Sequence, residues 1–163
     1  MSAVSGMSRW LWLSLMVVLL DQASKQLIVA SFMLYENQEI LPVFNLTLVY
    51  NKGAAFSFLS DQSGWQRWFL AGVAAVVTLV MILWLRGLKQ HERLTAMALG
   101  LIIGGAVGNL IDRVLFGHVI DFLDFHFGQH HWPAFNVADS AISIGVAIML
   151  YEILFGPKEP KKT

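Results

Sequence analysis

Cysteine is absent from this chain of 163 residues, and charged residues make up only 13% of it. The first absence excludes a thiol nucleophile, a disulfide framework and thiolate metal sites. Because the formal net charge is zero, the composition gives no reason to expect nucleic acid or a strongly acidic partner. A chain so poor in charge must meet most of its surroundings through apolar side chains.

Common hydrolase and metal motifs are missing as well. The chain has no Gly-x-Ser-x-Gly and no His-Glu-x-x-His, so neither a serine elbow nor a zinc helix is indicated. His126, His130 and His131 include an offset of four that would suit a metal on a helix. Beside Phe127 and Trp132 they are more typical of headgroup or solvent contacts at a membrane interface. We therefore expect no metal and no cofactor.

Apolar residues are what the chain does have, at 56% hydrophobic and a mean hydropathy of +0.61. A membrane-spanning helix needs about 20 apolar residues, and four stretches qualify, at about 10–32, 68–85, 94–110 and 138–155. The sequence thus predicts one integral membrane domain over residues 1–163, an all-α four-transmembrane-helix bundle. The first stretch could pass for a signal peptide, but Asp21 stands where small cleavage-site residues belong, so we expect a retained span.

Lys and Arg predict the orientation, because cytoplasmic segments carry their excess. Seven of the eleven lie before the first span, in the short loop after the second, or in the tail. They are Arg9, Arg86, Lys89, Arg93, Lys158, Lys161 and Lys162. Both termini are therefore expected in the cytoplasm, and the longer connections, about 34–67 and 111–136, on the periplasmic side.

The first outer connection carries a strand pattern. Phe44, Leu46, Leu48 and Tyr50 alternate with the positions between them, which is the period of a strand with one apolar face. A turn signal follows at residues 51–53, and residues 54–59 could return as a second strand. A small periplasmic β element is expected, with an irregular loop as the alternative. The second connection reads as an aromatic loop, 115–131, that could lie over a site.

Three glycines in the third span recur every four residues, at Gly100, Gly104 and Gly108. Small residues at this spacing let helix backbones approach closely in lipid. The pattern predicts helix docking, either as plain packing or as close packing that also sets a site.

Two aspartates near the end of the chain are the best chemical clue. Asp121 lies in an apolar run and Asp139 at the start of the last span. An acid at a membrane edge is costly to ionise and is by default a functional hypothesis. If the two converge, they share one proton near neutral pH. The alternative is that Asp139 merely caps a helix with Asn136 while Asp121 binds water. Asp124, three residues on, could also face a site.

Other charged residues fall into pairs. Asp21 and Lys25, four apart on a helix, are expected to form an ion pair, with a catalytic Lys25 as the alternative. Asp112 and Arg113 are expected to pair, end the third helix and fix the next loop, with Asp112 as a catalytic group the alternative. Asn109 lies beside both on the helix surface.

Five short motifs in order resemble those of the lipoprotein signal peptidase family, also called signal peptidase II. They are Asp21-Gln22-x-x-Lys25, Asn51-x-Gly53-Ala54-Ala55-Phe56, Gly104-Gly105-x-x-Gly108-Asn109-x-x-Asp112-Arg113, Val119-Ile120-Asp121-Phe122 and Phe135-Asn136-x-Ala138-Asp139. Each alone is weakly specific. Their order, and the agreement in span number, make the resemblance specific.

The resemblance implies an aspartic endopeptidase of the bacterial cytoplasmic (inner) membrane, with its site at the periplasmic face. Such an enzyme removes the signal peptide from diacylglyceryl-modified prolipoproteins, cutting just before the lipidated cysteine, and is inhibited by globomycin-type compounds. The resemblance makes Asp121 and Asp139 the catalytic dyad. It implies supporting roles for nine residues: Asn51, Gly53, Asn109, Arg113, Asn136, Ala138, Asp21, Lys25 and Asp112. Membrane lipid would be a further partner.

Two other functions remain open from the residues alone. A small proton-coupled transporter would also bury acids, although such proteins favour inverted-repeat halves and none is evident here. A non-catalytic scaffold held by its glycine surface is the other.

Overall fold

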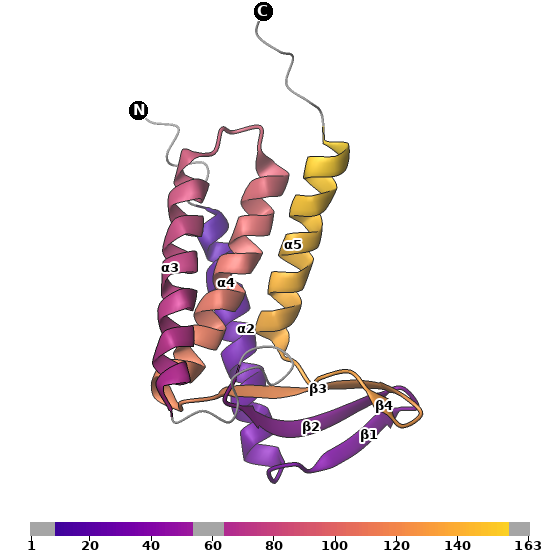
Figure 1. The fold of residues 1–163 in the computed structure, drawn as a ribbon. Helices are drawn as coiled ribbons and strands as arrows, with labels where there is room; N and C mark the ends of the chain where they lie inside the picture. Colours follow the sequence, from indigo (N-terminus) through magenta and orange to yellow (C-terminus); the bar gives the residue numbers. More distant parts are fainter. Residues whose placement is uncertain (1–8, 54–63, 157–163) are drawn as a thin grey trace, which may run out of the picture.

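Four helices form the body of the molecule in the computed structural model, which describes residues 9–53 and 64–156. They are α2 (Trp10–Ser31), α3 (Trp65–Gly87), α4 (Arg93–Leu115) and α5 (Val137–Phe155). They stand side by side as a bundle (Figure 1). Each is long and apolar enough to cross a membrane, which confirms the predicted four-helix membrane fold.

Two helices extend beyond the apolar stretches that predicted them. Helix α3 begins at Trp65 rather than at residue 68, and α4 continues to Leu115 rather than ending at residue 110. The last turns of α4 carry Asn109 and Asp112, both buried. A helix can continue through such polar residues when they find partners inside the bundle, and hydropathy alone does not detect this.

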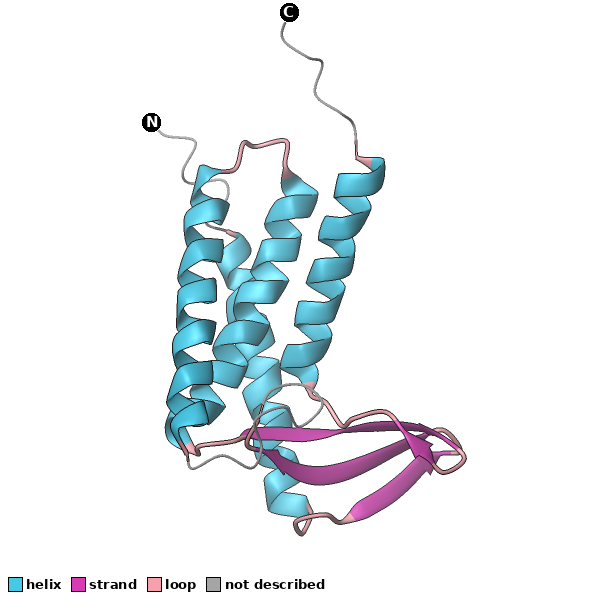
Figure 2. Cartoon of the chain, in the orientation of Figure 1, coloured by secondary structure: helices cyan, strands magenta, loops and turns pink. Residues whose placement is uncertain are grey.

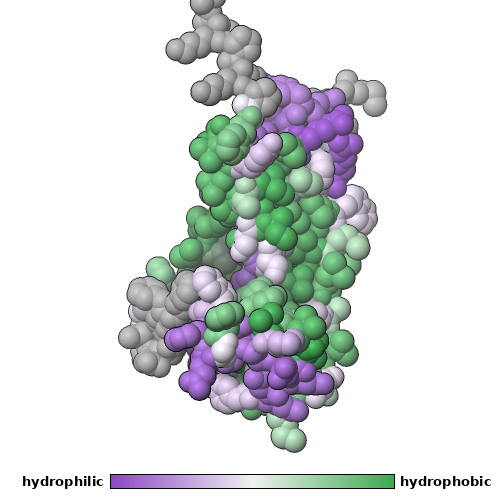
Figure 3. Space-filling model, turned by 90° about the vertical axis from the view of Figure 1, so that its right-hand side faces the viewer, coloured by the Kyte–Doolittle hydropathy of each residue, from purple (hydrophilic) through white to green (hydrophobic). Residues whose placement is uncertain are grey.

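Helix α4 is the centre of the bundle and contacts each of the others. In the most apolar 18-residue stretch of each helix, 61% of α4 is buried, against 28% of α2 and 17% of α3 and of α5. The outer helices therefore expose their apolar side chains. Figure 3 shows the result on one face, an apolar band between two polar ends, as expected for a surface in contact with lipid.

Glycines allow α4 to approach its neighbours. A Cβ added at Gly104 would lie 2.7 Å from the Cβ of Val17 and 2.8 Å from the Ser14 carbonyl oxygen of α2. A Cβ at Gly105 would overlap the Ala138 carbonyl oxygen of α5. The predicted helix docking is therefore confirmed, and it uses two faces of α4.

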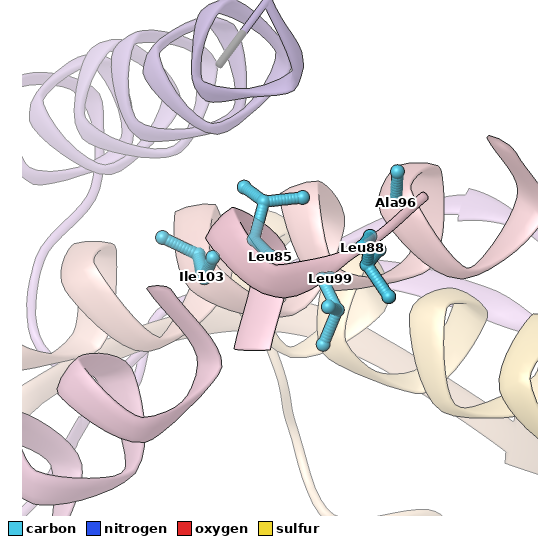
Figure 4. Packing of buried hydrophobic residues seen from close by; sticks show 5 residues of the cluster. All are labelled: Leu85, Leu88, Ala96, Leu99 and Ile103. Atoms are coloured by element: carbon cyan, nitrogen blue, oxygen red, sulfur yellow. The ribbon is translucent and has the colours of Figure 1, made fainter. Parts of the chain in front are cut away.

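The turn between α3 and α4 is closed by an apolar cluster (Figure 4). Leu85 and Leu88 come from the end of α3 and the turn, and pack with Ala96, Leu99 and Ile103 of α4. All five are buried. The burial fixes the α3–α4 hairpin at the end of the bundle where α2 begins and α5 ends (Figure 1).

A four-stranded antiparallel sheet lies at the opposite end of the bundle (Figures 1 and 2). Its order is β1 (Asn37–Leu41), β2 (Phe44–Asn51), β3 (Val119–Phe127) and β4 (His130–His131). The predicted β element and its strand over 44–51 are confirmed. The strand predicted at 54–59 lies outside the described residues.

The aromatic loop predicted over 115–131 is wrong, because most of it forms β3 and β4. The first four residues of β3, Val119, Ile120, Asp121 and Phe122, are buried in succession and give no alternating signal, and only residues 123–127 alternate between apolar and polar types. A strand covered on both faces reads as a continuous apolar run, which periodicity cannot assign.

The sheet meets the bundle through an apolar face on which Leu48, Ile120 and Phe122 pack against Ile28 of α2. A bulge marks β3, where the N–H groups of Phe122 and Leu123 both donate to the Phe135 carbonyl, at 3.0 and 2.8 Å. These two hydrogen bonds tie β3 to the segment that leads into α5. The strand and the helix start are thereby brought together.

Candidate active site

Asp121 lies on the other face of the sheet, opposite Val49 of β2. Its side chain is buried, with 2% of the residue exposed. Asn51, at the end of β2, donates its Nδ2–H to Asp121 Oδ2 at 3.0 Å. The second oxygen accepts from Asn136 Nδ2 at 2.7 Å. Amides, rather than cations, thus hold this carboxylate.

Asp139 lies in the first turn of α5 and is half-buried. Asn109 of α4 donates its Nδ2–H to Asp139 Oδ1 at 2.7 Å. The helix start also favours a negative charge at this position. Asp139 comes from a different element than Asp121, yet both are held by the same kind of group.

Asn136 connects the two aspartates. It is fully buried, and its Oδ1 accepts from the Asp139 N–H at 2.9 Å, so the predicted N-cap of α5 is confirmed. Its Nδ2 lies 2.7 Å from Asp121 and 3.2 Å from both Asn109 Oδ1 and the Ile120 carbonyl. An amide has only two such hydrogens, so the shortest contact, to Asp121, takes one of them.

The pKa of Asp121 is raised from 3.8 to about 7, mainly by burial and in addition by the nearby Asp139 carboxylate. The hydrogen bonds from Asn51 and Asn136 oppose this shift in pKa. An acid with a pKa near neutrality holds and releases a proton at physiological pH. The pair can therefore carry one proton between two carboxylates.

Arg113, in the last turn of α4, is the cation near this pair. Its guanidinium donates to the carbonyls of Asn109 and Gly53, both at 3.3 Å. It makes no ion pair within hydrogen-bond distance among the described residues. The predicted Asp112–Arg113 pair is therefore wrong: neighbours on a helix point about 100° apart, and Asp112 has a different partner.

That partner is Lys25, which lies between two carboxylates. Its Nζ is 2.8 Å from Asp21 Oδ2 and 2.7 Å from Asp112 Oδ2, and all three side chains are fully buried. The predicted Asp21–Lys25 ion pair is confirmed. The Lys25 Nζ also donates to Asn109 Oδ1 at 3.1 Å. One cation here serves two acids and reaches the amide that holds Asp139.

The Lys25 cluster (Asp21, Lys25 and Asp112) also holds the backbone next to each aspartate of the pair. Asp112 Oδ2 accepts from the Ile120 N–H at 3.2 Å, directly before Asp121. Asp21 Oδ1 accepts from the Ala138 N–H at 2.9 Å, directly before Asp139. The three residues therefore act on the site through the backbone.

Sequence reasoning passed over two residues of this network. Gln22 donates to Asp112 Oδ1 at 2.8 Å and to the Gly108 carbonyl at 3.2 Å. Arg67, at the start of α3, donates to the carbonyls of Arg113 and Val114 at 2.7 Å, a favourable position for a cation at a helix C-terminus. A polar residue beside Asp21 in an apolar span was the available signal for the first.

The histidines are not on a helix, so the metal alternative loses its geometric basis. They lie on β3 and β4, where His131 Nδ1 contacts Asp124 at 2.9 Å. Within residues 9–53 and 64–156 no three acids or histidines converge as metal ligands do. Asp124 faces away from the apolar cluster, as Asp121 does, but it pairs with Asn45 rather than with Asp139.

Comparison with known proteins agrees with this geometry. A family model described as Signal peptidase (SPase) II matches residues 13–155. The chain belongs to the signal peptidase II family. It is 55% identical over 145 residues to the lipoprotein signal peptidase of Cupriavidus taiwanensis, covering 89% of this chain and 82% of that one. It is 50% identical over 151 residues to the lipoprotein signal peptidase of Yersinia enterocolitica, covering 93% and 89%.

Solved structures of similar fold support the membership. One is described as "Bacterial membrane enzyme structure by the in meso method at 2.3 A resolution", with a TM-score of 0.82 and 29% identity over 96% of this chain and 95% of that one. A second structure, described as "Bacterial membrane enzyme structure by the in meso method at 1.9 A resolution", gives a TM-score of 0.80 and 29% identity over 92% of this chain and 95% of that one. A member of the signal peptidase II family is a peptidase, so the transporter and scaffold alternatives are set aside.

Proposed function

We propose that this protein is an aspartic endopeptidase that removes the signal peptide from diacylglyceryl-modified prolipoproteins, with Asp121 and Asp139 as its catalytic dyad. The observation that carries the proposal is that Asn136 links two aspartates from different elements, donating to the Asp121 carboxylate and accepting from the Asp139 N–H. Among the described residues no cation is bonded to either carboxylate. Such a pair shares a proton, as in aspartic peptidases. The names of the relatives indicate the lipoprotein substrate.

Hydrolysis by this pair needs one protonated and one ionised carboxyl. The ionised member takes a proton from water as the water oxygen bonds to the scissile carbonyl carbon, and the protonated member gives its proton to the carbonyl oxygen. Collapse of the tetrahedral intermediate breaks the C–N bond: the departing amine takes the proton that came from water, and the other carboxylate takes back a proton from a hydroxyl of the intermediate as the carbonyl re-forms. The pair ends with one proton, as it began.

The site also suits a lipidated substrate. Asp139 lies at the end of an apolar helix, and Asp121 in a sheet just beyond the bundle. Acyl chains of a substrate can remain in the leaflet while its peptide reaches both carboxylates. We infer that the cut falls directly before the lipidated cysteine, in the inner membrane, with the sheet periplasmic and both termini cytoplasmic. Globomycin-type inhibitors would then compete at this site.

Several residues would support the dyad in this function. Asn51, Asn109 and Asn136 would orient the carboxylates, Gly53 and Arg113 would border the peptide, and Ala138, Asp21, Lys25 and Asp112 would fix the backbone. Each of these roles follows from the contacts above. None requires a metal or a cofactor.

The proposal is tested by incubating the detergent-purified protein with a diacylglyceryl-modified precursor and with the same precursor lacking the lipid. We expect a product whose mass begins at the lipidated cysteine, only from the first substrate, and none with Asp121→Asn. A product from a different bond, or equal cutting by Asp121→Asn, would refute the assignment.

A further inference from the structure

A groove of about 530 Å³ crosses the face of the sheet that carries Asp121. Each of the four strands contributes to it, and two aromatic residues are among its lining. The lining residues are Tyr35, Asn37, Thr47, Val49, Asp124, His131, Trp132, Pro133 and Ala134. None of the signal peptidase roles described above uses this groove.

The polar floor of the groove is an acid. Asp124 is 6% exposed, and its Oδ2 accepts from Asn45 Nδ2 at 3.0 Å and contacts His131 Nδ1 at 2.9 Å. A carboxylate can accept about four hydrogen bonds, so capacity remains for a donor in the groove. The bond to Asp124 assigns the proton of a neutral His131 to Nδ1, which leaves Nε2 as an acceptor. The floor therefore favours donors and cations.

Charge around the groove has the same sign. Among its described lining residues, His131 is the only one that can become positive. Glu39 of β1 lies opposite Asn45 of β2 in the sheet. Asp121 of β3 lies opposite Val49 of β2. An acidic side chain bound here would meet Asp124 with little compensation, which is unfavourable in a partly desolvated site.

The rim of the groove is held in an unusual conformation. Tyr35 has φ of 64°, in the left-handed region that is uncommon for a residue other than glycine. Its N–H donates to the Leu48 carbonyl at 2.8 Å, which fixes this turn to β2. Backbone in such a conformation is concentrated at ligand sites.

The groove continues from the dyad. Asp124 is three residues from Asp121, which in a strand is about 10 Å, the length of about three residues of an extended peptide. A peptide with its scissile bond at Asp121 that follows the sheet would therefore place a residue two to four positions away over Asp124. The signal peptide is apolar and belongs among the helices, whereas the segment after the cysteine is free to enter a polar groove.

We propose that this groove binds the first residues after the lipidated cysteine, and that the Asp124–His131 pair selects against acidic side chains there in favour of basic or hydrogen-bond-donating ones. The inference rests on the proposed function, since it names the part of the substrate that the same site receives. It adds a specificity pocket to a catalytic pair.

The test is a set of diacylglyceryl-modified precursors that differ only at the second, third or fourth position after the cysteine, with Lys, Gln or Asp. We expect kcat/KM for Asp to be roughly five- to tenfold below that for Lys at one of these positions, the size of one charge interaction at a partly exposed site. Asp124→Asn should remove this ratio. Glu92→Gln, which removes a charge from the turn between α3 and α4 at the opposite end of the bundle from the sheet, should retain it.

A second variant guards against misfolding of Asp124→Asn. Asn37→Lys adds a cation to the groove from exposed β1 and should invert the preference toward Asp. Equal kcat/KM for Lys and Asp at every position of the wild type would overturn the inference, as would a ratio unchanged in Asp124→Asn and Asn37→Lys. If the wild type cuts none of the lipidated precursors, the proposed peptidase function itself fails, which is a separate result.

Discussion

Two neighbouring groups of carboxylates, Asp21 with Asp112 and Asp121 with Asp139, differ in what compensates their charge. The Lys25 cluster holds Asp21 and Asp112 on one ammonium group, and all three side chains are fully buried. Within the described part of the chain, the side chains bonded to the carboxylates of the proposed dyad, Asp121 and Asp139, are asparagine amides. A cation holds a carboxylate ionised and occupied, whereas neutral amides leave its proton affinity high. The first arrangement suits structure, and the second suits proton transfer.

Asn109 joins the two groups and shows why they lie together. Its Oδ1 accepts from Lys25 at 3.1 Å and its Nδ2 donates to Asp139 at 2.7 Å. Because an ammonium group can only donate, the amide oxygen must face Lys25, and the nitrogen is then directed to Asp139. The structural cluster thereby sets the orientation of a group in the proposed catalytic site.

The largest effect should come from removing a proton-transfer group without changing its volume. Asp121→Asn or Asp139→Asn is expected to lower kcat/KM by about 10²–10⁴-fold or more, while the thermal unfolding midpoint stays equal or rises, since a buried, uncompensated acid is gone. Cleavage of a lipidated precursor and unfolding in detergent measure the two. Glu39→Gln is the control, and a large loss of stability in either Asn variant would contradict the contrast with the Lys25 cluster.

Removing the cation should produce the opposite pattern. Lys25→Met leaves Asp21 and Asp112 buried without compensation, and we expect a loss of about 3–5 kcal/mol in the free energy of unfolding. The double variant Lys25→Met/Asp112→Asn removes one of the two orphaned charges and should recover part of this loss. Denaturant unfolding of the purified protein provides the measurement. Equal stability of Lys25→Met and the wild type would show that the cluster is not structural.

The packing of α4 against α5, beside the two groups of carboxylates, can be tested by adding one methyl group to α4. Gly105→Ala would push α4 away from Ala138, the residue before Asp139, and overpacking of this kind costs about 1–3 kcal/mol. Gly72→Ala is the matched control, because a Cβ there meets nothing within 4 Å. Thermal unfolding should separate the two variants. If both behave as the wild type, the α4–α5 contact tolerates separation.

A pH profile should distinguish a shared proton from a fixed ion pair. With the pKa of Asp121 raised to about 7, cleavage should fall about tenfold per pH unit above that value as the dyad loses its proton. Burial lowers the pKa of His118, so its titration does not contribute to the alkaline limb. A rate constant that stays level to pH 9 would contradict a dyad that needs its proton.

The same pKa has a consequence for stability. Because the folded value is raised above 3.8, the contribution of Asp121 is fully present below about pH 4 and is lost as the pH rises through about 7. In Asp121→Asn this decline should be smaller, which thermal unfolding across pH would detect.

The smallest expected effect concerns a single amide. The bond from Asn51 lowers the pKa of Asp121, so Asn51→Ala should move the alkaline limb of the pH profile upward, by roughly 0.5–1 unit for one hydrogen bond. The position of the limb is the readout, independent of any change in the maximal rate. A downward shift would mean that Asn51 does not hold the ionised form.

Local patterns in the sequence were sufficient for the membrane fold and for part of the site. Apolar length predicted four spans, the four-residue glycine spacing predicted the close packing of α4, and the offset of four predicted the Asp21–Lys25 pair. The strand over 44–51 was predicted by its alternation. All of these depend on residues near one another in the chain.

Features that depend on distant residues were missed or misjudged. The pairing of β2 with β3 joins segments about 70 residues apart, and the first half of β3, buried on both faces, has no periodic signal. Asp112 was assigned to Arg113, its neighbour in sequence, whereas its ion pair is with Lys25 in another helix. Proximity in the chain says nothing about which cation lies nearest in a folded bundle.

By itself, the sequence determined that this chain lies in a membrane, because apolar length and scarce charge act on each helix separately. It also marked the acids that are costly to bury. Only the tertiary structure decided which acids are compensated by Lys25 and which are held by amides, because that depends on where four helices and a sheet place charges that lie far apart in the chain.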